Sequence, residues 1–192
     1  MNTLIPPFNP FEDHFVGAID APVELLLYGD FQCEHCADVY PAVQSLREAM
    51  GGRMRFVYRH FPQPDVYPLA LDTAVASEVA GFQGKFWQMY DMLYLNQKYM
   101  ARSSISHFAE ILKIDTRLYE NSGDYRKLVQ KIIRDFESGV KSGIDETPTF
   151  FINEKRYSGT VDFENLCKYC CHAEAIASRT TMWWMPSAAQ RL

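Results

Sequence analysis

The chain has 192 residues, 47% of them hydrophobic, and its 24 acidic and 19 basic residues give a net charge of −5. That length and apolar content allow one sizeable core, so we expect one large domain or one domain with an insertion. No basic patch stands out, which argues against nucleic acid as a partner. The apolar stretches are far shorter than a membrane span, so we expect no membrane partner either.

The N-terminal segment and the cysteines indicate a compartment. A secretory signal needs a positive region followed by an apolar segment, and residues 1–22 supply neither. We therefore predict a cytoplasmic protein if Met1 is the true start, and a periplasmic one only if a signal peptide has been removed. The five cysteines are an odd number, which does not indicate a structural disulfide framework. A reducing compartment would leave them as thiols, metal ligands or catalytic groups.

Two cysteines, Cys33 and Cys36, stand at a predicted strand-to-helix corner. Residues 23–31 are apolar and β-prone, which is typical of a buried strand. Residues 37–50 repeat apolar side chains at three- and four-residue steps, which predicts a helix. The first sulfur then lies at a helix N-terminus, where unpaired N–H groups favour the thiolate that attacks disulfides.

The remaining pattern predicts four elements in chain order: a strand over 53–61, a helical block over 68–143, a hairpin over 147–158 and a helix over 163–177. A helical block set between a βαβ half and a ββα half is an insertion rather than an independent domain. We expect three parts: a discontinuous α/β domain at 12–68 and 143–177, a helical insertion at 69–142 and a C-terminal tail at 178–192.

Four segments resemble the DsbA-like thioredoxin-fold proteins, and they follow the family's order over about residues 15–168. Ala21-Pro-Val and then Tyr28-Gly-Asp-Phe-Gln-Cys-Glu-His-Cys36 look like the family's strand leading into its active site. Arg59-His-Phe-Pro62 looks like the end of its next central strand. Gly84-Lys-Phe-Trp-Gln-Met-Tyr-Asp-Met-Leu-Tyr94 looks like its helical insertion. Gly143 to Asn153, with Tyr157-Ser-Gly159, looks like its cis-proline loop and final hairpin.

The resemblance implies a thioredoxin fold with a helical insertion between the βαβ and ββα halves, and a thiol–disulfide oxidoreductase. Cys33 would be the attacking thiol, Cys36 the resolving thiol, and Pro148 the cis-proline facing them, with Thr147 before it. The implied substrates are protein or peptide thiols and disulfides, with an unidentified redox partner. No cofactor is implied beyond the redox-active Cys33–Cys36 pair. The family often has proline or an aromatic where Glu34 stands, so the direction of the reaction stays open.

We expect Thr147, Pro148 and Glu34 to contact substrate. A cis-proline exposes an extended edge at Thr147, with which a peptide can pair as an added strand. We place His35 with the catalytic cysteines, because its charge or its N–H group would stabilise the Cys33 thiolate. The charge of Glu34 opposes that thiolate. We therefore predict a pKa of Cys33 below that of free cysteine, but not at the bottom of the range for CxxC motifs.

Two carboxylates, Glu24 and Asp30, are candidates for relaying protons to Cys36. Glu24 lies on the strand that leads to the active site, and Asp30 stands near the end of that segment. The alternative for both residues is a solvated charge without a role, and the sequence does not decide between the two interpretations.

A second group of cysteines, Cys167, Cys170 and Cys171, shares one face of the last predicted helix. A zinc site needs further ligands, and no matching pair stands elsewhere in the chain. Buried free cysteine behaves as a small apolar residue, so we expect no zinc there and no metal elsewhere. In the tail, Trp183 and Trp184 would form a sticky patch, which would dock on the body, pair two subunits as a homodimer or be disordered.

The sequence thus predicts an enzyme that exchanges disulfides with protein or peptide substrates. One alternative is a glutathione-linked transferase or isomerase of the same fold. The intact pair of cysteines argues against it, because such proteins often need only one cysteine or a serine. The other alternative is a non-catalytic peptide-binding module whose CxxC acts as a redox switch or a metal clip.

Overall fold

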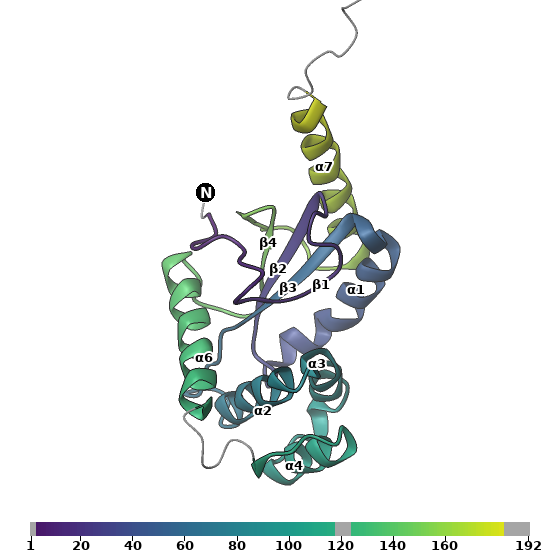
Figure 1. The fold of residues 1–192 in the computed structure, drawn as a ribbon. Coiled ribbons are helices and arrows are strands. Elements are labelled where there is room, and N and C mark those ends of the chain that lie inside the picture. Colours follow the sequence, from purple (N-terminus) through teal and green to yellow (C-terminus); the bar gives the residue numbers. More distant parts are fainter. Residues whose placement is uncertain (1–2, 118–123, 183–192) are drawn as a thin grey trace, which may run out of the picture.

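The computed structural model describes residues 3–117 and 124–182, and a mixed five-stranded sheet forms its centre (Figure 1). The strands lie in the order β1 (His14–Val16), β3 (Met54–His60), β2 (Val23–Gly29), β4 (Thr149–Ile152) and β5 (Lys155–Arg156). Helix α1 (Glu34–Met50) connects β2 to β3, and these two strands are parallel. The other neighbouring pairs are antiparallel.

The register of β2 decides where the cysteines lie. Gly29 pairs with His60 on one side, and Tyr28 pairs with Thr149 on the other. The segment that follows Gly29 and the segment that precedes Thr149 therefore meet at the same end of the sheet. That end holds the dithiol and the Thr147–Pro148 loop.

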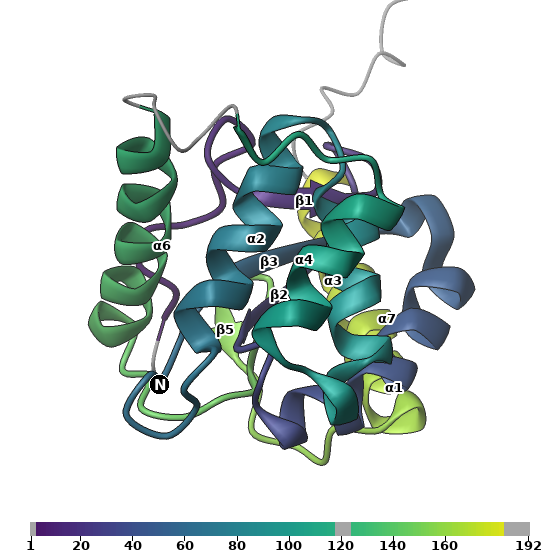
Figure 2. The same ribbon diagram turned by 90° about the horizontal axis from the view of Figure 1, so that it is seen from below.

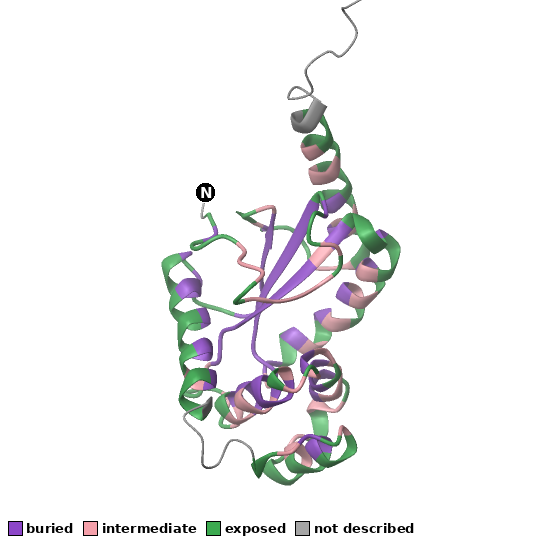
Figure 3. Cartoon of the chain, viewed as in Figure 1, coloured by how far each residue is buried: buried purple, intermediate pink, exposed green. Residues whose placement is uncertain are grey.

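The central strands are buried on both faces, as Figure 3 shows, and their alternation builds two cores. One core faces α1 and α7 (Phe163–Met182), and its strand residues include Leu25, Leu27, Phe56, Tyr58 and Phe150. The other lies on the opposite face and contains Leu26, Tyr28, Val57, Phe61 and Phe151. Helix α6 (Asp124–Lys141) covers this second core, where the Phe136 ring stacks on the Phe61 ring with centroids 4.6 Å apart.

The helical insertion between β3 and β4 contains α2 (Ala70–Phe82), α3 (Phe86–Leu95) and α4 (Arg102–Ile111) before α6. The three helices lie together across one end of the sheet (Figure 2), and α6 packs against both α2 and β3. Short 3₁₀ turns occur at η1 (Gly51–Arg53) and η2 (Gln97–Tyr99). Within the described residues, none of the helices is both long and apolar enough to cross a membrane.

Three elements differ from the sequence prediction. Strand β1 was not predicted, because three half-buried residues are too few to show an alternating pattern. Helix α1 begins at Glu34, so Cys36 already lies inside it. Helix α7 continues to Met182, because no helix breaker stands before Pro186, so the segment 178–182 is helical rather than part of a separate tail. Trp183 and Trp184 lie outside the described residues.

Candidate active site

Cys33 is the N-cap of helix α1 and Cys36 lies in its first turn. The backbone of Cys33 is extended, with φ −69° and ψ 118°, and its carbonyl accepts the N–H of Cys36 at 3.0 Å and of Ala37 at 3.2 Å. Both cysteines are free thiols, and each is 1% exposed. The strand-to-helix corner predicted from the sequence is therefore present, and both thiols are buried there.

The surroundings of Cys33 lower the pKa of its thiol to about 5. The largest cause is a hydrogen bond from the Cys36 thiol, which favours the thiolate. Burial opposes ionisation. The Cys36 hydrogen bond, together with smaller ones from the side chains of Thr147 and Tyr67 and from the Cys36 N–H, outweighs burial. Cys33 is therefore the thiol of this pair that ionises first.

The pKa of Cys36 shifts in the opposite direction. Complete burial raises its pKa well above that of an ordinary thiol, and the hydrogen bond to Cys33 and the charge of Cys33 raise it further. The Asp30 N–H opposes this by hydrogen-bonding the Cys36 sulfur. The two thiols thus differ in acidity: Cys33 ionises first and Cys36 keeps its proton.

The Thr147–Pro148 peptide bond is cis, which is the geometry that the family resemblance implies. When Cys33 is protonated, its thiol donates to the Thr147 carbonyl oxygen at 3.4 Å. Thr147 is 6% exposed, and its hydroxyl lies 3.4 Å from Gln63 Oε1. The loop before β4 therefore contacts the sulfur that ionises first.

Asp30 is a buried carboxyl group directly after β2, and it lies beside the dithiol. Its oxygens accept the backbone N–H of Gln32 at 2.8 Å and of Gln63 at 2.9 Å. The pKa of Asp30 is raised to about 6. Burial is the main cause, the two N–H groups oppose it, and the charge of Cys33 adds to it. The carboxyl group can therefore gain and lose a proton near neutral pH.

A cavity of about 970 Å³ opens beside the first turn of α1. Its walls come from α1, from the segment before α2 and from the end of α3 with η2. Glu34 and Asp38 supply acidic groups, and Val66, Leu95 and Tyr99 are apolar side chains that are 64%, 70% and 82% exposed. Exposed apolar groups of this kind mark binding surfaces.

A sequence model of the thioredoxin family matches residues 11–170, which is most of the chain. The chain belongs to the thioredoxin family. Among solved structures, alpha-DsbA1 of Wolbachia pipientis matches with a TM-score of 0.78 at 19% identity, over 93% of this chain and 98% of that one. The catalytic domain of Proteus mirabilis ScsC matches with a TM-score of 0.72 at 20% identity, over 88% and 92%. The predicted DsbA-like thioredoxin fold is confirmed.

Curated relatives of this thioredoxin-family protein carry the name of an antiporter. It is 38% identical over 164 residues to Na⁺/H⁺ antiporter NhaA 1 of Salinispora arenicola, and 35% identical over 159 residues to NhaA of Herminiimonas arsenicoxydans. The matches cover 85% and 83% of this chain and 25% of each relative. The chain thus spans about a quarter of the length of these relatives. The antiporter name belongs to the long proteins.

Two predicted site residues of this thioredoxin-family chain do not reach the dithiol. Glu24 lies five residues before the end of β2, or about 16 Å along a strand, and it pairs with Arg55 at 2.8 Å. The prediction that Glu24 relays protons to Cys36 is therefore wrong. The side chain of His35 is 78% exposed and lies 3.9 Å from Asp38, so its ring faces solvent rather than Cys33.

Two residues near the dithiol were not predicted. The Tyr67 hydroxyl hydrogen-bonds the Cys33 thiol, an interaction that raises the pKa of Tyr67. Gln97 Nε2 donates to the backbone oxygens of Phe31 at 2.9 Å and Cys33 at 2.8 Å, which anchors the loop before α1. Both come from the chain beyond β3, and their contacts depend on how the insertion packs. For Tyr67, the sequence offered one local sign of a special position, because this aromatic residue stands directly before Pro68.

The other three cysteines lie in α7, a helix that packs against α1. Cys170 is fully buried in the core between α1 and α7, and burial raises its pKa to about 12. Cys167 is half-buried and Cys171 is exposed. Cys170 therefore acts as a small apolar core residue, which is the interpretation that the sequence favoured.

Proposed function

We propose that this thioredoxin-family protein exchanges thiols and disulfides with protein or peptide substrates through Cys33 and Cys36. The observation that carries the proposal is geometric: Cys33 is the N-cap of helix α1, Cys36 is buried in its first turn, and Cys33 Sγ lies 3.4 Å from the Thr147 carbonyl oxygen, before the cis bond to Pro148. The pKa values, lowered to about 5 for Cys33 and raised for Cys36, agree with this arrangement. Disulfide exchange needs one thiolate that attacks and a second thiol that waits for the mixed disulfide. Both cysteines are buried, which limits the access of solvent to the pair between reactions.

The exchange takes two steps and requires no cofactor besides the two cysteines. The Cys33 thiolate attacks one sulfur of a substrate disulfide, forms the mixed disulfide and releases one substrate thiolate. Cys36 then loses its proton and attacks Cys33 Sγ, which forms the Cys33–Cys36 disulfide and releases the second substrate thiolate. The substrate gains two electrons and the dithiol loses them. The same steps in reverse oxidise a substrate dithiol, and the redox partner determines the direction.

The resolving step requires a base for Cys36, and we assign that role to Asp30. The Asp30 carboxylate is buried beside the two cysteines, and its pKa of about 6 suits proton exchange near neutral pH. The proton passes from Cys36 to Asp30 and then to the departing thiolate.

We assign substrate binding to the Thr147–Pro148 loop and to the adjoining cavity. A peptide that pairs with Thr147 would bring its disulfide to Cys33, because the Thr147 carbonyl oxygen lies 3.4 Å from that sulfur. Glu34 lines the cavity next to the dithiol. This position suits contact with the chain that flanks the substrate disulfide.

Trapping the mixed disulfide tests the order of attack. The Cys36→Ala variant, mixed with a disulfide-containing peptide, should accumulate a peptide adduct on Cys33, which mass spectrometry of the digested protein locates. The Cys33→Ala variant is the matched control and should accumulate no adduct on Cys36, because that thiol keeps its proton. An adduct on Cys36 in that control, or on the exposed Cys171 in preference to Cys33, would contradict the proposal.

A further inference from the structure

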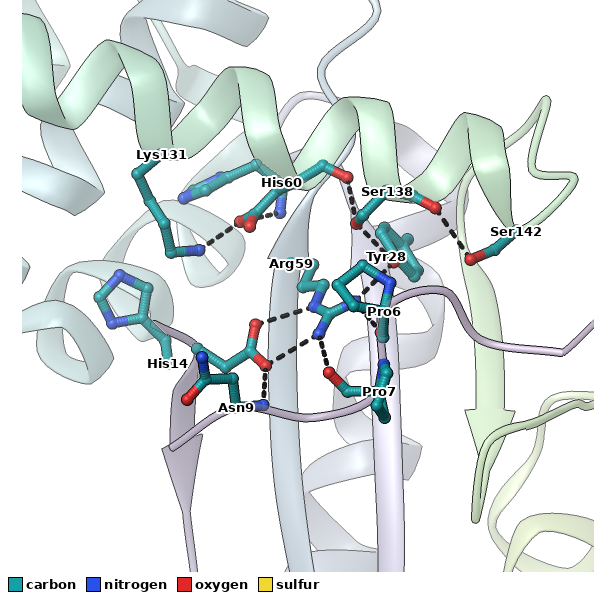
Figure 4. A network of polar contacts seen from close by, with 12 residues as sticks. Pro6, Pro7, Asn9, His14, Tyr28, Arg59, His60, Lys131, Ser138 and Ser142 are labelled. Atoms are coloured by element: carbon teal, nitrogen blue, oxygen red, sulfur yellow. Dashed lines mark hydrogen bonds and ion pairs between the residues drawn. The ribbon is translucent and has the colours of Figure 1, made fainter. Parts of the chain in front are cut away.

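A second cluster of chemically active side chains contains none of the cysteines. His60 ends β3, Glu78 lies in α2 and Asp135 lies in α6, and all three are buried. One ligand atom from each lies within 4.8 Å of the ligand atoms of the other two. Figure 4 shows His60 beneath helix α6, with His14 and Lys131 on the same side of the sheet. The sequence gives no spacing pattern for these residues, because they come from three separate segments.

The nitrogen and oxygen atoms are close to the separation that a metal requires. His60 Nε2 and His14 Nε2 each lie 2.9 Å from Glu78 Oε1. In a tetrahedral site with bonds of about 2.0–2.1 Å, neighbouring ligand atoms stand about 3.3 Å apart. Shifts of a few tenths of an ångström would therefore place an ion between them. Imidazole and carboxylate together suit borderline divalent ions of the zinc type.

The histidine rings are held in place by their neighbours. The His14 ring stacks on Phe86 with centroids 3.5 Å apart, and the His60 ring packs edge-on against Tyr58 at 5.3 Å. Ligands that are fixed before the ion arrives lose little entropy on binding. Packing has therefore already positioned these two imidazoles.

The buried charges around the cluster favour a bound cation. Three carboxylates, Glu78, Asp135 and Asp13, face two cations. Lys131 Nζ lies 2.5 Å from Asp135 Oδ2, and Arg59 Nε lies 2.8 Å from Asp13 Oδ1. With neutral histidines the group carries one net negative charge. This negative charge favours the binding of a cation.

The cluster has a way in from solvent. The side chain of His14 is 22% exposed, so one edge of the group reaches the surface. A cavity of about 170 Å³ also lies along α6, with Lys131 and Asp135 in its walls. An ion would therefore not need to cross the packed core.

We propose that His60, Glu78 and Asp135, with His14 at the rim, form a binding site for one divalent transition-metal ion of the zinc class. Such an ion would join β3 to helices α2 and α6, and so fix the insertion on the sheet. The site uses no cysteine. Its test therefore does not depend on the proposed disulfide exchange.

Cobalt(II) is the probe, because its spectrum separates this site from the cysteines. Chelator-treated full-length protein titrated with Co²⁺ should bind one ion with visible d–d bands and without a thiolate-to-cobalt charge-transfer band. Zn²⁺ should displace it, since zinc binds such ligands more tightly, and both ions should raise the thermal unfolding midpoint. No binding would overturn the proposal, because the cluster would then be only a set of buried hydrogen bonds and ion pairs. Binding that shows only the thiolate band would also overturn it.

Two variants and a control locate the ion. His60→Gln and the partly exposed His14→Gln should each weaken Co²⁺ binding at least about tenfold. His107→Gln changes an exposed histidine on α4 and should leave the affinity unchanged. Circular dichroism checks that each variant folds, and His14→Gln serves alone if His60→Gln does not fold. Unchanged affinity in a folded His14→Gln or His60→Gln variant would refute the assignment.

Discussion

At the scale of residues, the proposed exchange depends on two neighbouring cysteines whose pKa values shift in opposite directions. Cys33 gains hydrogen bonds from Cys36, Thr147 and Tyr67 that favour its thiolate. Cys36 is fully buried beside that charge and keeps its proton. The helix N-terminus predicted from the sequence contributes one N–H group, and the larger contribution comes from the second thiol.

The ionisation of Cys33 makes the first prediction. Thiolate absorbance of the reduced protein should rise with a midpoint near pH 5, the pKa given by its surroundings. Cys36→Ala should move that midpoint upward, because it removes the largest of these hydrogen bonds. A midpoint at the ordinary thiol value of about 8.5 in the unchanged protein would contradict this account.

The same pKa predicts how stability depends on pH. Between about pH 5 and 8.5 the unfolded chain binds a proton at Cys33 and the folded chain does not, so the free energy of unfolding rises with pH. The contribution is complete above about pH 8.5 and is lost as the pH falls through 5. Urea unfolding of the reduced protein should show a difference from Cys33→Ala that grows from pH 5 to 8. A constant difference would count against the lowered pKa.

Tyr67 makes a prediction that the sequence did not offer. Tyr67→Phe removes the hydroxyl that hydrogen-bonds Cys33, so the pKa of Cys33 should rise and its alkylation by iodoacetamide at pH 5–6 should slow. Tyr99→Phe is the matched control, because Tyr99 lines the same cavity and is 82% exposed. Equal alkylation rates in the two variants would remove Tyr67 from the site.

At the scale of elements, helix α6 approaches the sheet at a glycine. A Cβ atom at Gly139 would lie 2.7 Å from the Phe61 ring and 3.2 Å from the Tyr28 ring. This close approach lets α6 cover the face of β2 and β3 that lies opposite α1. The hydrophobic pattern predicted the helix, but it did not reveal which residue touches the sheet.

Gly139→Ala should therefore destabilise the fold by about 1–3 kcal/mol, because the packed ring must move to admit the methyl group. Gly52→Ala is the control, since a Cβ atom there would meet nothing within 4 Å. Chemical denaturation of both variants measures the difference. A Gly139→Ala protein as stable as Gly52→Ala would show that α6 packs more loosely than described.

At the scale of the whole molecule, the sequence predicted what local pattern and motif determine. Residues 23–36 displayed a buried strand followed by CxxC, and the segment around Pro148 resembled the family's loop, so the fold and the position of the dithiol could be predicted. Contacts between distant segments could not. Tyr67 and Gln97 reach Cys33 only after the insertion packs, and Glu24 is separated from it by the length of β2.

The central claim is that Cys33 attacks a substrate disulfide and that Cys36 resolves the product. The most direct test is the reductive turnover of a protein disulfide such as that of insulin, with the unchanged protein, Cys33→Ser, Cys36→Ser and the control Cys171→Ser. We predict that Cys33→Ser abolishes turnover, that Cys36→Ser allows attack but stops at the mixed disulfide, and that Cys171→Ser retains full activity. Turnover that survives in Cys33→Ser would contradict the account.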